Sequence, residues 1–465
     1  MRSHELKGGD HAEEGMEGGR GPAEGRGESG SAERPPVAVG EAVRALGRRA
    51  RVAGRLLARC SAAQRDAGLL AMADALIGAS PAILRANALD VEAARARGLS
   101  AAMLDRLTLT EGRVAAMAEG IRRVASLPDP VGEVLREWTA ESGVQIRKVR
   151  VPIGVIGIIY ESRPNVTSDA AVLCTKTGNA TILRGGSESL HSNVAIAAAL
   201  SAGCAAAGLP EDSILLIPFT DREAVRALCE MDEFLDLLIP RGGKGLIETV
   251  VAHARMPVIK HYDGVCAFYV DAKGDMAMAE ALVLNAKCQR PGVCNAIETV
   301  LVHQDRVREF QRVVGRALVE RGVEVRCDAA ALSASEAVAL PDSVARGRFV
   351  PATEADFRTE FLDLILAVKT VDGLEAAIAH IEAHGSHHSD GIITEDPVAA
   401  ERFLQEVDSA TVYWNASTRF TDGGEFGFGA EIGISTDKLH ARGPMGLEEL
   451  TTYKYQIRGH GEVRR

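Results

Sequence analysis

Hydrophobic and polar positions change their spacing along the chain, and the changes divide it into segments. Residues 1–36 are mostly Gly, Glu and Arg with almost no large apolar side chains, so they cannot bury enough surface to offset the entropy of ordering. We expect a disordered tail there. From 37 to 127 apolar residues recur at helical spacing, interrupted at Pro81 and Gly98. One predicted helix face comprises Leu69, Leu70, Met72, Leu76 and Ile77.

Beyond this helical region the pattern becomes extended. Two amphipathic runs at 134–138 and 144–149, joined by a Glu-Ser-Gly turn, predict a hairpin. Apolar strands then alternate with helical patterns, which is typical of parallel sheets covered by helices. The predicted strands are 155–160, 180–183, 214–217, 235–239, 258–260, 266–270, 297–302, 361–368, 391–394 and 410–414. A last alternating run at 450–457 would pair with the hairpin of a neighbouring chain.

Composition narrows the class of protein. With 465 residues and 46% hydrophobic content, the chain can form two or three domains. The net charge of −11 argues against nucleic acid as a partner, and the lack of a long apolar run or signal sequence argues against a membrane or secretion. Eight cysteines without a CxxC pair indicate reduced thiols in a cytoplasmic protein, and we expect no metal site.

Cys294 is the leading candidate for chemistry. It lies on a Pro-Gly turn between a helical segment and an apolar run, a position that presents a thiol to a cleft. Nearby Lys287 and Arg290 would favour its nucleophilic thiolate. From residue chemistry alone, a buried and inert cysteine is the alternative.

Three other segments offer groups that bind anions. Arg184-Gly-Gly-Ser187 ends a strand, and its guanidinium suits a phosphate unless it is simply a solvated charge. Pro240-Arg-Gly-Gly-Lys-Gly245 leads into a helix whose first N–H groups would bind phosphate, with a plain glycine turn as the alternative. The hydroxyl-rich loop 415–429 would hold the carboxylate of an amino acid or be purely structural. No G-x-G-x-x-G follows any predicted strand.

The run Gln289-Arg-Pro-Gly-Val-Cys-Asn-Ala-Ile-Glu-Thr299 resembles the nucleophile motif of the gamma-glutamyl phosphate reductases (glutamate-5-semialdehyde dehydrogenases), a branch of the aldehyde dehydrogenase superfamily. The resemblance implies an α/β, aldehyde dehydrogenase-like fold with two parallel-sheet α/β domains and a small β oligomerisation element. The implied division is a tail at 1–36, a cofactor-binding domain at 37–132, 152–264 and 416–445, a catalytic domain at 265–415, and oligomerisation strands at 133–151 and 446–465.

The resemblance also implies roles for individual residues. Cys294 would be the nucleophile, and Asn165 would join its backbone N–H in an oxyanion hole, with a turn-capping role as the alternative for Asn165. Arg184 and Ser187 stand near the Lys-Pro-Ser-Glu position of NAD-preferring relatives, which favours NADP(H) as the cofactor. The implied cofactor site comprises Gly157, Arg184, Gly185, Ser187, Gly242, Gly243 and Lys244, and the implied substrate site comprises Arg163, Arg290, Ser417 and Thr418.

The implied function is that of an oxidoreductase in proline biosynthesis. It would reduce L-glutamyl 5-phosphate to L-glutamate 5-semialdehyde and phosphate with NADPH through a cysteine thioester. The segment 260–265 lacks the general-base glutamate of hydrolytic relatives, as a reductive enzyme requires. A homo-oligomer and transient contact with a glutamate 5-kinase are the implied partners. The alternatives are a CoA-acylating aldehyde dehydrogenase, and a silent scaffold in which Cys294 would resist alkylation at neutral pH.

A histidine cluster requires a separate interpretation. His380, His384, His387 and His388, with Asp390, have a spacing that could gather metal ligands. The run that contains them is similar to a family signature that binds no metal. We therefore expect these residues to shape the rim of the active site.

Overall fold

The computed structural model describes residues 36–161, 163–339 and 348–464, so the tail expected at 1–36 lies outside the described residues except for Pro36. The helical region forms α1 (Pro36–Leu57), α2 (Ala62–Gly78), α3 (Ser80–Ala96), α4 (Ala101–Leu107) and α5 (Glu111–Ser126). Pro81 lies in the first turn of α3 and Gly98, with φ 74°, follows its end, so both breaks are confirmed.

The apolar face predicted for α2 is only partly right. Leu69, Met72 and Leu76 are fully buried, whereas Leu70 is 47% and Ile77 42% exposed. Residues three and four apart share a helix face, and the side chains adjacent to that face in sequence point away from it.

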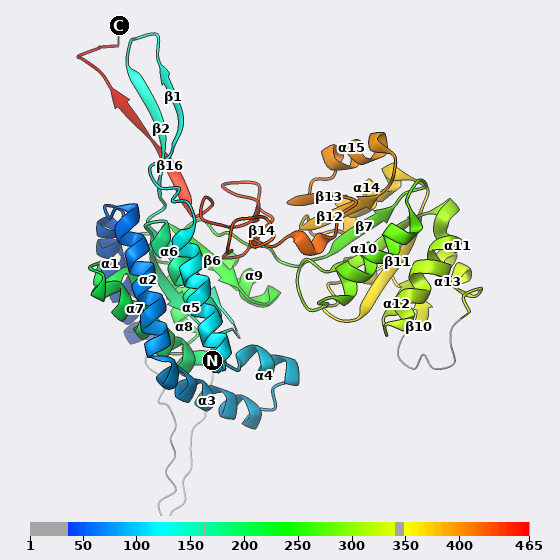
Figure 1. Ribbon diagram of the computed structural model, residues 1–465, viewed down its shortest axis with the longest axis horizontal. Helices are drawn as coiled ribbons and strands as arrows, with labels where there is room; N and C mark the ends of the chain where they lie inside the picture. The colour runs from blue at the N-terminus through cyan, green and yellow to red at the C-terminus, as the bar shows by residue number, and fades with distance from the viewer. Residues whose placement is uncertain (1–35, 162, 340–347, 465) are drawn as a thin grey trace, which may run out of the picture.

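A parallel four-stranded sheet organises the first lobe of the molecule (Figure 1). Its order is β5-β4-β3-β6, with β3 (Val155–Tyr160), β4 (Ala180–Arg184), β5 (Ile214–Leu216) and β6 (Leu237–Arg241). Helices α2, α5, α6 (Asn165–Lys176) and α7 (Leu190–Ala206) pack on one face, and α1, α8 (Glu223–Cys229) and α9 (Lys244–His253) on the other. The strand expected at 258–260 makes an isolated bridge between Leu238 and Val258 instead.

Helix α7 passes close to α2 because both carry small residues at the crossing. A Cβ added to Gly203 would lie 2.6 Å from Cα of Met72, so only glycine permits this approach. The stretch Ser187–Ala206 has, by length and composition alone, the character of a membrane-spanning helix, and half of it is buried inside the fold. Its apolar side chains therefore serve the core of the first lobe.

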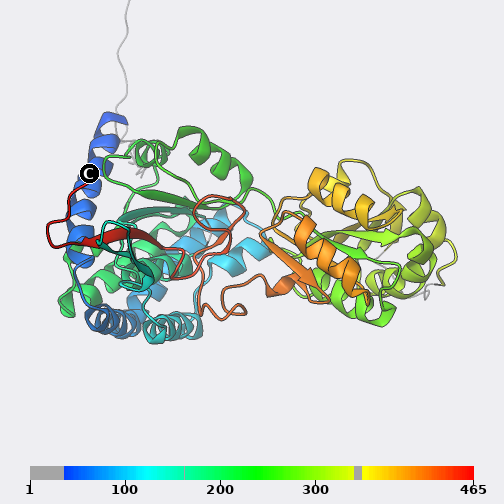
Figure 2. The same ribbon diagram turned by 90° about the horizontal axis from the view of Figure 1, so that it is seen from above.

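The second lobe is built on a parallel seven-stranded sheet, of order β10-β9-β11-β8-β7-β12-β13 (Figure 2). Its strands are β7 (Cys266–Val270), β8 (Ile297–His303), β9 (Glu324–Cys327), β10 (Arg348–Pro351), β11 (Ile365–Val371), β12 (Ser389–Ile393) and β13 (Thr411–Trp414). One face carries α10 (Met276–Cys288), α11 (Val307–Phe310), α12 (Arg316–Glu320) and α13 (Ala329–Ser335), and the other carries α14 (Leu374–His384) and α15 (Pro397–Glu406). The sequence did not predict β9 and β10.

A three-stranded antiparallel sheet projects from the first lobe, made of β1 (Val134–Thr139), β2 (Gln145–Pro152) and β16 (Thr451–Arg458) (Figure 1). The predicted hairpin is thus present. Strand β16 pairs with β2 of its own chain, from Thr451 opposite Pro152 to Arg458 opposite Gln145, and forms one edge of this sheet. Pairing of its other edge with a neighbouring chain stays a prediction.

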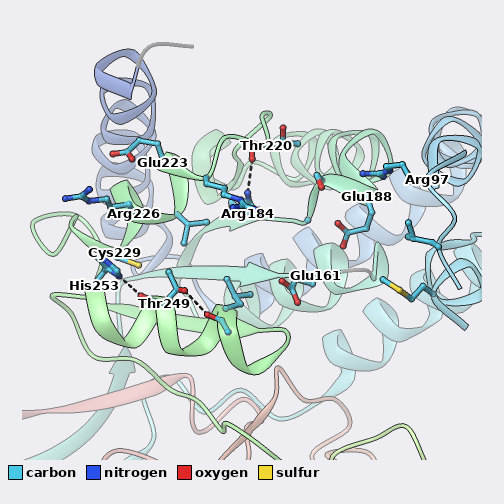
Figure 3. A pocket seen from close by; sticks show the side chains of 18 residues that line it. Arg97, Glu161, Arg184, Glu188, Thr220, Glu223, Arg226, Cys229, Thr249 and His253 are labelled. Carbon is cyan, nitrogen blue, oxygen red and sulfur yellow. Dashed lines mark hydrogen bonds between the residues drawn. The ribbon is translucent and has the colours of Figure 1, made fainter. Parts of the chain in front are cut away.

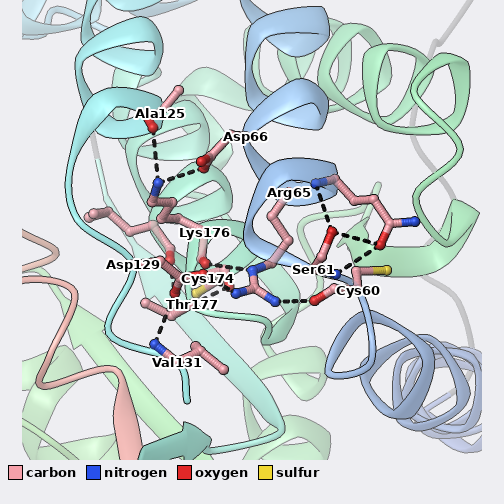
Figure 4. A network of polar contacts seen from close by, with 12 residues as sticks. Cys60, Ser61, Arg65, Asp66, Ala125, Asp129, Val131, Cys174, Lys176 and Thr177 are labelled. Carbon is pink, nitrogen blue, oxygen red and sulfur yellow. Dashed lines mark hydrogen bonds and ion pairs between the residues drawn. The ribbon is translucent and has the colours of Figure 1, made fainter. Parts of the chain in front are cut away.

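A buried polar network ties three helices of the first lobe together (Figure 4). Arg65 of α2 is 2% exposed, and its Nε donates to the Lys176 carbonyl at 2.9 Å while its other nitrogens donate to the Cys60 carbonyl and the Asp129 carboxylate. Lys176 at the end of α6 donates to Asp66 at 2.5 Å and to the Ala125 carbonyl at 2.9 Å. A planar guanidinium can serve three separate acceptors at once.

Replacing Arg65 by lysine should destabilise the first lobe, because an ammonium on a shorter stem cannot reach all three acceptors. We expect the free energy of unfolding to fall by about 1.5–3 kcal/mol in urea titrations. The matched control is Arg55→Lys on the exposed side of α1. Equal stability of the two variants would contradict the role assigned to the network.

Candidate active site

The turn that carries Cys294 lies between the end of α10 and the start of β8. Its shape is held by the loop after β13. The Thr418 hydroxyl donates to the carbonyl of Asn295 at 2.7 Å, and the Asn295 amide donates to the Thr421 carbonyl at 2.8 Å. Arg419 also donates to Gln289 at 2.8 Å. These bonds clamp the turn on both sides of the thiol.

Two residues predicted to bind substrate belong to this clamp. Thr418 is fully buried and its hydroxyl is used by Asn295, while the buried Ser417 accepts a bond from the N–H of Arg419. The structure therefore places both hydroxyls beside the nucleophile turn, engaged with their own chain. Their substrate contact stays a prediction.

The backbone of Cys294 lies directly against Gly264. A Cβ added to Gly264 would lie 2.1 Å from the carbonyl oxygen of Cys294 and 2.7 Å from its Cα. Cys266, two residues on, donates its thiol to the same carbonyl at 3.2 Å. The segment predicted to lack a general base thus sets the position of Cys294, and any side chain at 264 would displace it.

The charges around the thiol differ from those expected. Lys287 is fully buried and bonds to Glu298 at 2.5 Å, so the expectation that it activates Cys294 is wrong: its helix turns it toward that carboxylate. Burial raises the pKa of Cys294 to about 11, opposed by Arg241 and aided by Glu360 and Glu431. The free protein therefore holds a neutral thiol at pH 7, and slow alkylation is expected of an enzyme as well as of a scaffold.

Two histidines stand beside the thiol. One ring nitrogen of His261, one of His388 and the Sγ of Cys294 lie within 4.8 Å of one another. Burial lowers the pKa of His388 to about 3 and that of His261 to about 4, so both rings are neutral at pH 7. His388 thus lies at the nucleophile itself, deeper than the rim at which the sequence placed it.

An arginine-rich cavity of about 450 Å³ adjoins the nucleophile turn. It brings together three predicted residues, Arg163, Asn165 and Arg290, with Arg106 and Arg113, which the sequence did not indicate. Burial lowers the pKa of Arg163, and the like charges of Arg106 and Arg290 lower it further, while the Cys294 thiolate would raise it. Such a concentration of guanidinium groups suits an anionic substrate.

Asn165 is the first residue of α6 and lines this cavity. Its amide donates to Asp169 at 2.9 Å, one turn further along the helix. Burial raises the pKa of Asp169 to about 6. The bond fixes the Asn165 amide against Asp169, and its part in an oxyanion hole stays a prediction.

A larger cavity of about 960 Å³ opens at the end of β4 (Figure 3). Arg184 and Ser187 line it, as do Gly186, Glu161 and Gly245. Arg184 is 9% exposed and donates to the Thr220 carbonyl at 3.1 Å, and its Nε is buried with no hydrogen-bond partner among the described residues. A buried donor without a partner requires an explanation, and an acceptor supplied by a ligand would be one.

The remaining residues predicted for the cofactor lie outside this lining. Gly157 is buried in β3, and Gly185 abuts Asn193, whose amide nitrogen would lie 2.0 Å from an added Cβ. At the start of α9, the Gly243 N–H donates to Glu161 at 3.0 Å and Lys244 donates to Asp263 at 2.7 Å. The position expected to bind phosphate is thus occupied by a carboxylate of the chain itself.

Comparison with known proteins agrees with the site. The aldehyde dehydrogenase family model matches residues 33–333. The chain is 55% identical to the gamma-glutamyl phosphate reductase of Moorella thermoacetica (91% of this chain, 98% of the relative) and 52% identical to that of Paramagnetospirillum magneticum (90% and 96%). The crystal structure of gamma-glutamyl phosphate reductase from Thermotoga maritima superposes with a TM-score of 0.87 at 44% identity, covering 91% of this chain and all of that one.

Gly264→Ala should impair turnover more than stability. The new methyl group cannot fit against the Cys294 backbone and must displace it, and misplacement of a reacting atom by about 1 Å costs on the order of a hundredfold in rate. Turnover and the thermal midpoint would be compared with those of Gly373→Ala, where an added Cβ meets nothing within 4 Å. Undiminished turnover in Gly264→Ala would show that the contact does not set the nucleophile.

Proposed function

Because the chain belongs to the aldehyde dehydrogenase family and is an enzyme of its gamma-glutamyl phosphate reductase branch, we propose that it reduces L-glutamyl 5-phosphate to L-glutamate 5-semialdehyde and phosphate with NADPH, through a thioester on Cys294. This is a step of proline biosynthesis. The observation that carries the proposal is the position of Cys294, on a clamped turn beside a cavity rich in arginines.

In the first half of the proposed reaction, Cys294 forms a bond to the acyl carbon and phosphate leaves. Arg163, Arg106 and Arg290 hold the departing anion by charge-assisted hydrogen bonds. The thiol must lose its proton, and one nitrogen of each of the neutral rings of His261 and His388 lies within 4.8 Å of its sulfur, a separation that one water molecule can bridge. Asn165 and the Cys294 N–H stabilise the oxyanion of the tetrahedral intermediate.

In the second half, the thioester is released as the aldehyde. The family uses nicotinamide cofactors, and NADPH, when bound, supplies the hydride for this step. The Arg184 cavity fits such a group, because the unpaired Nε and the neighbouring Ser187 hydroxyl offer donors to a 2′-phosphate. Glu360 and Glu431 lie near Cys294, but neither belongs to the segment 260–265, where hydrolytic relatives carry their general base.

We further propose that the protein is a cytoplasmic homo-oligomer whose projecting sheet joins the subunits. Tyr453, Tyr455 and Ile457 of β16 are 48%, 54% and 64% exposed, which is unfavourable for an isolated strand in water. A second subunit would cover them.

The reverse reaction tests the chemistry directly, because the acyl phosphate is labile. Purified protein with glutamate semialdehyde and NADP⁺ should form reduced cofactor only when inorganic phosphate is present, and Cys294→Ala should abolish the reaction while still binding NADPH. Absorbance of the reduced cofactor is the measurement. Dependence on CoA instead of phosphate would assign the protein to the acylating dehydrogenases, and a fully active Cys294→Ala would exclude the thioester.

Arg184→Ser should weaken the preference for NADPH. Loss of a charge-assisted bond to the 2′-phosphate, about 1.5–3 kcal/mol, corresponds to a rise in KM for NADPH of roughly ten- to a hundredfold with little change for NADH. Arg255→Ser, at an exposed position outside the lining of the cavity, is the control. An equal loss with both cofactors would indicate that Arg184 does not contact the 2′-phosphate.

A further inference from the structure

We propose that Cys294, His261 and His388 form a binding site for one soft divalent cation of the Zn²⁺ class, and that the bound ion holds the enzyme inactive until it is removed. Thiolate sulfur and imidazole nitrogen are the ligands that Zn²⁺ prefers, and three of them leave a fourth position for water. The ligands come from three separate parts of the chain.

The geometry gives each histidine one nitrogen for the ion. Nδ1 of His261 lies 3.0 Å from the Ile434 carbonyl, to which it can only donate, and Nδ1 of His388 lies 2.8 Å from the Ser389 hydroxyl. Nε2 therefore remains on each ring. A second nitrogen fixed by a carbonyl or hydroxyl is the arrangement that orients ligand histidines in metal sites.

An independent observation points to a ligand at this position. His388 is fully buried, and its Nε2 has no hydrogen-bond partner among the described residues. A buried polar atom without a partner is unfavourable, so a cation that accepts its lone pair would remove that cost. Cys294 and His261 are each half-buried, so two of the three ligand residues are not sealed inside the fold.

The ligand atoms need to move only slightly. They lie within 4.8 Å of one another, whereas ligands at bond lengths of about 2.0–2.3 Å in a tetrahedron are separated by roughly 3.5 Å. The His261 and His388 rings meet edge to face, with centroids 5.4 Å apart, so the two imidazoles already lie next to each other. Glu360 and Glu431 favour a cation here, and Arg241 opposes it.

Binding requires no redox partner. The S–H bond of Cys294 breaks, one proton passes to solvent, and the sulfur and the two Nε2 atoms each donate an electron pair to the ion. The sulfur lone pair that would attack an acyl carbon is then bound to the ion and is unavailable for the reaction. The inhibitory effect rests on the proposed function of Cys294, whereas the binding itself does not.

A second group of metal-binding residue types, Glu382, His387 and Asp408, provides the control. It is more exposed, and the Asp408 carboxylate already binds Arg442 at 2.7 Å and also Lys438. His387→Asn removes its imidazole, and asparagine tolerates the left-handed φ of 57° at this position.

The test uses Co²⁺ as a spectroscopic probe on the purified full chain without added thiols. Wild type and His387→Asn should bind one equivalent, with the intense visible bands of tetrahedral cobalt and a thiolate-to-cobalt charge-transfer band. The charge-transfer band should be absent in Cys294→Ser. In His388→Gln the affinity for Co²⁺ should fall by at least about tenfold. If His388→Gln does not fold, His261→Gln provides the same test.

Turnover gives the second measurement. One equivalent of Zn²⁺ should inhibit the wild-type reductase, and EDTA should restore its activity. A cobalt spectrum without the charge-transfer band, or one lost in His387→Asn but kept in His388→Gln, would overturn the site. Normal cobalt spectra in a protein without reductase activity would instead refute the proposed function and leave the metal site standing.

Discussion

The contact between Gly264 and the backbone of Cys294 is the constraint on which the site depends. It follows from the sheet: Gly264 lies two residues before β7 and Cys294 three residues before β8, and these strands are parallel neighbours with Cys266 opposite Ile297. Segments entering adjacent parallel strands arrive at the same edge. Because one of them must turn sharply to present a thiol, the other has no room for a side chain.

The same topology gathers the rest of the site. His388 immediately precedes β12, the other neighbour of β7. The segments that lead into the adjacent strands β7, β8 and β12 therefore carry Gly264, Cys294 and His388, respectively. Facing them are the carboxyl ends of the first sheet, where β3 leads to Arg163 and Asn165, β4 ends at Arg184 and β6 ends at Arg241. Ligands of open α/β sheets bind at such carboxyl ends, and here the amino edge of a second sheet supplies Cys294.

This arrangement explains which strands and site residues could be predicted from the sequence. Continuous apolar strands and the nucleophile motif are local signals, so both sheets and Cys294 were predictable from residues close together in the chain. Strands β9 and β10 were missed because each has four residues with polar side chains interspersed. Lys287 was misassigned because proximity in sequence does not say which way a helix turns its side chain, and this one turns toward Glu298. Arg106 carries no local signal, and neither the histidine cluster nor the segment 260–265 indicated that His388 and Gly264 lie next to Cys294, since only strand order and helix placement bring them to the site.

The two cavities differ in how far carboxylates of the chain compensate the positive charge of their arginines. In the smaller one, burial and then the like charges of neighbouring guanidinium groups lower the pKa of Arg163, so an anion that enters would offset both effects. In the larger one, Glu161 already neutralises the start of α9, which leaves Arg184 as the donor with an unpaired buried nitrogen. An anion gains most where positive charge is uncompensated. Several guanidinium groups of the smaller cavity can therefore stabilise one anion together, whereas the larger cavity is lined by Arg97, Arg184, Arg222 and Arg226 alongside Glu161, Glu188 and Glu223, so that its positive charge is partly compensated by the chain itself.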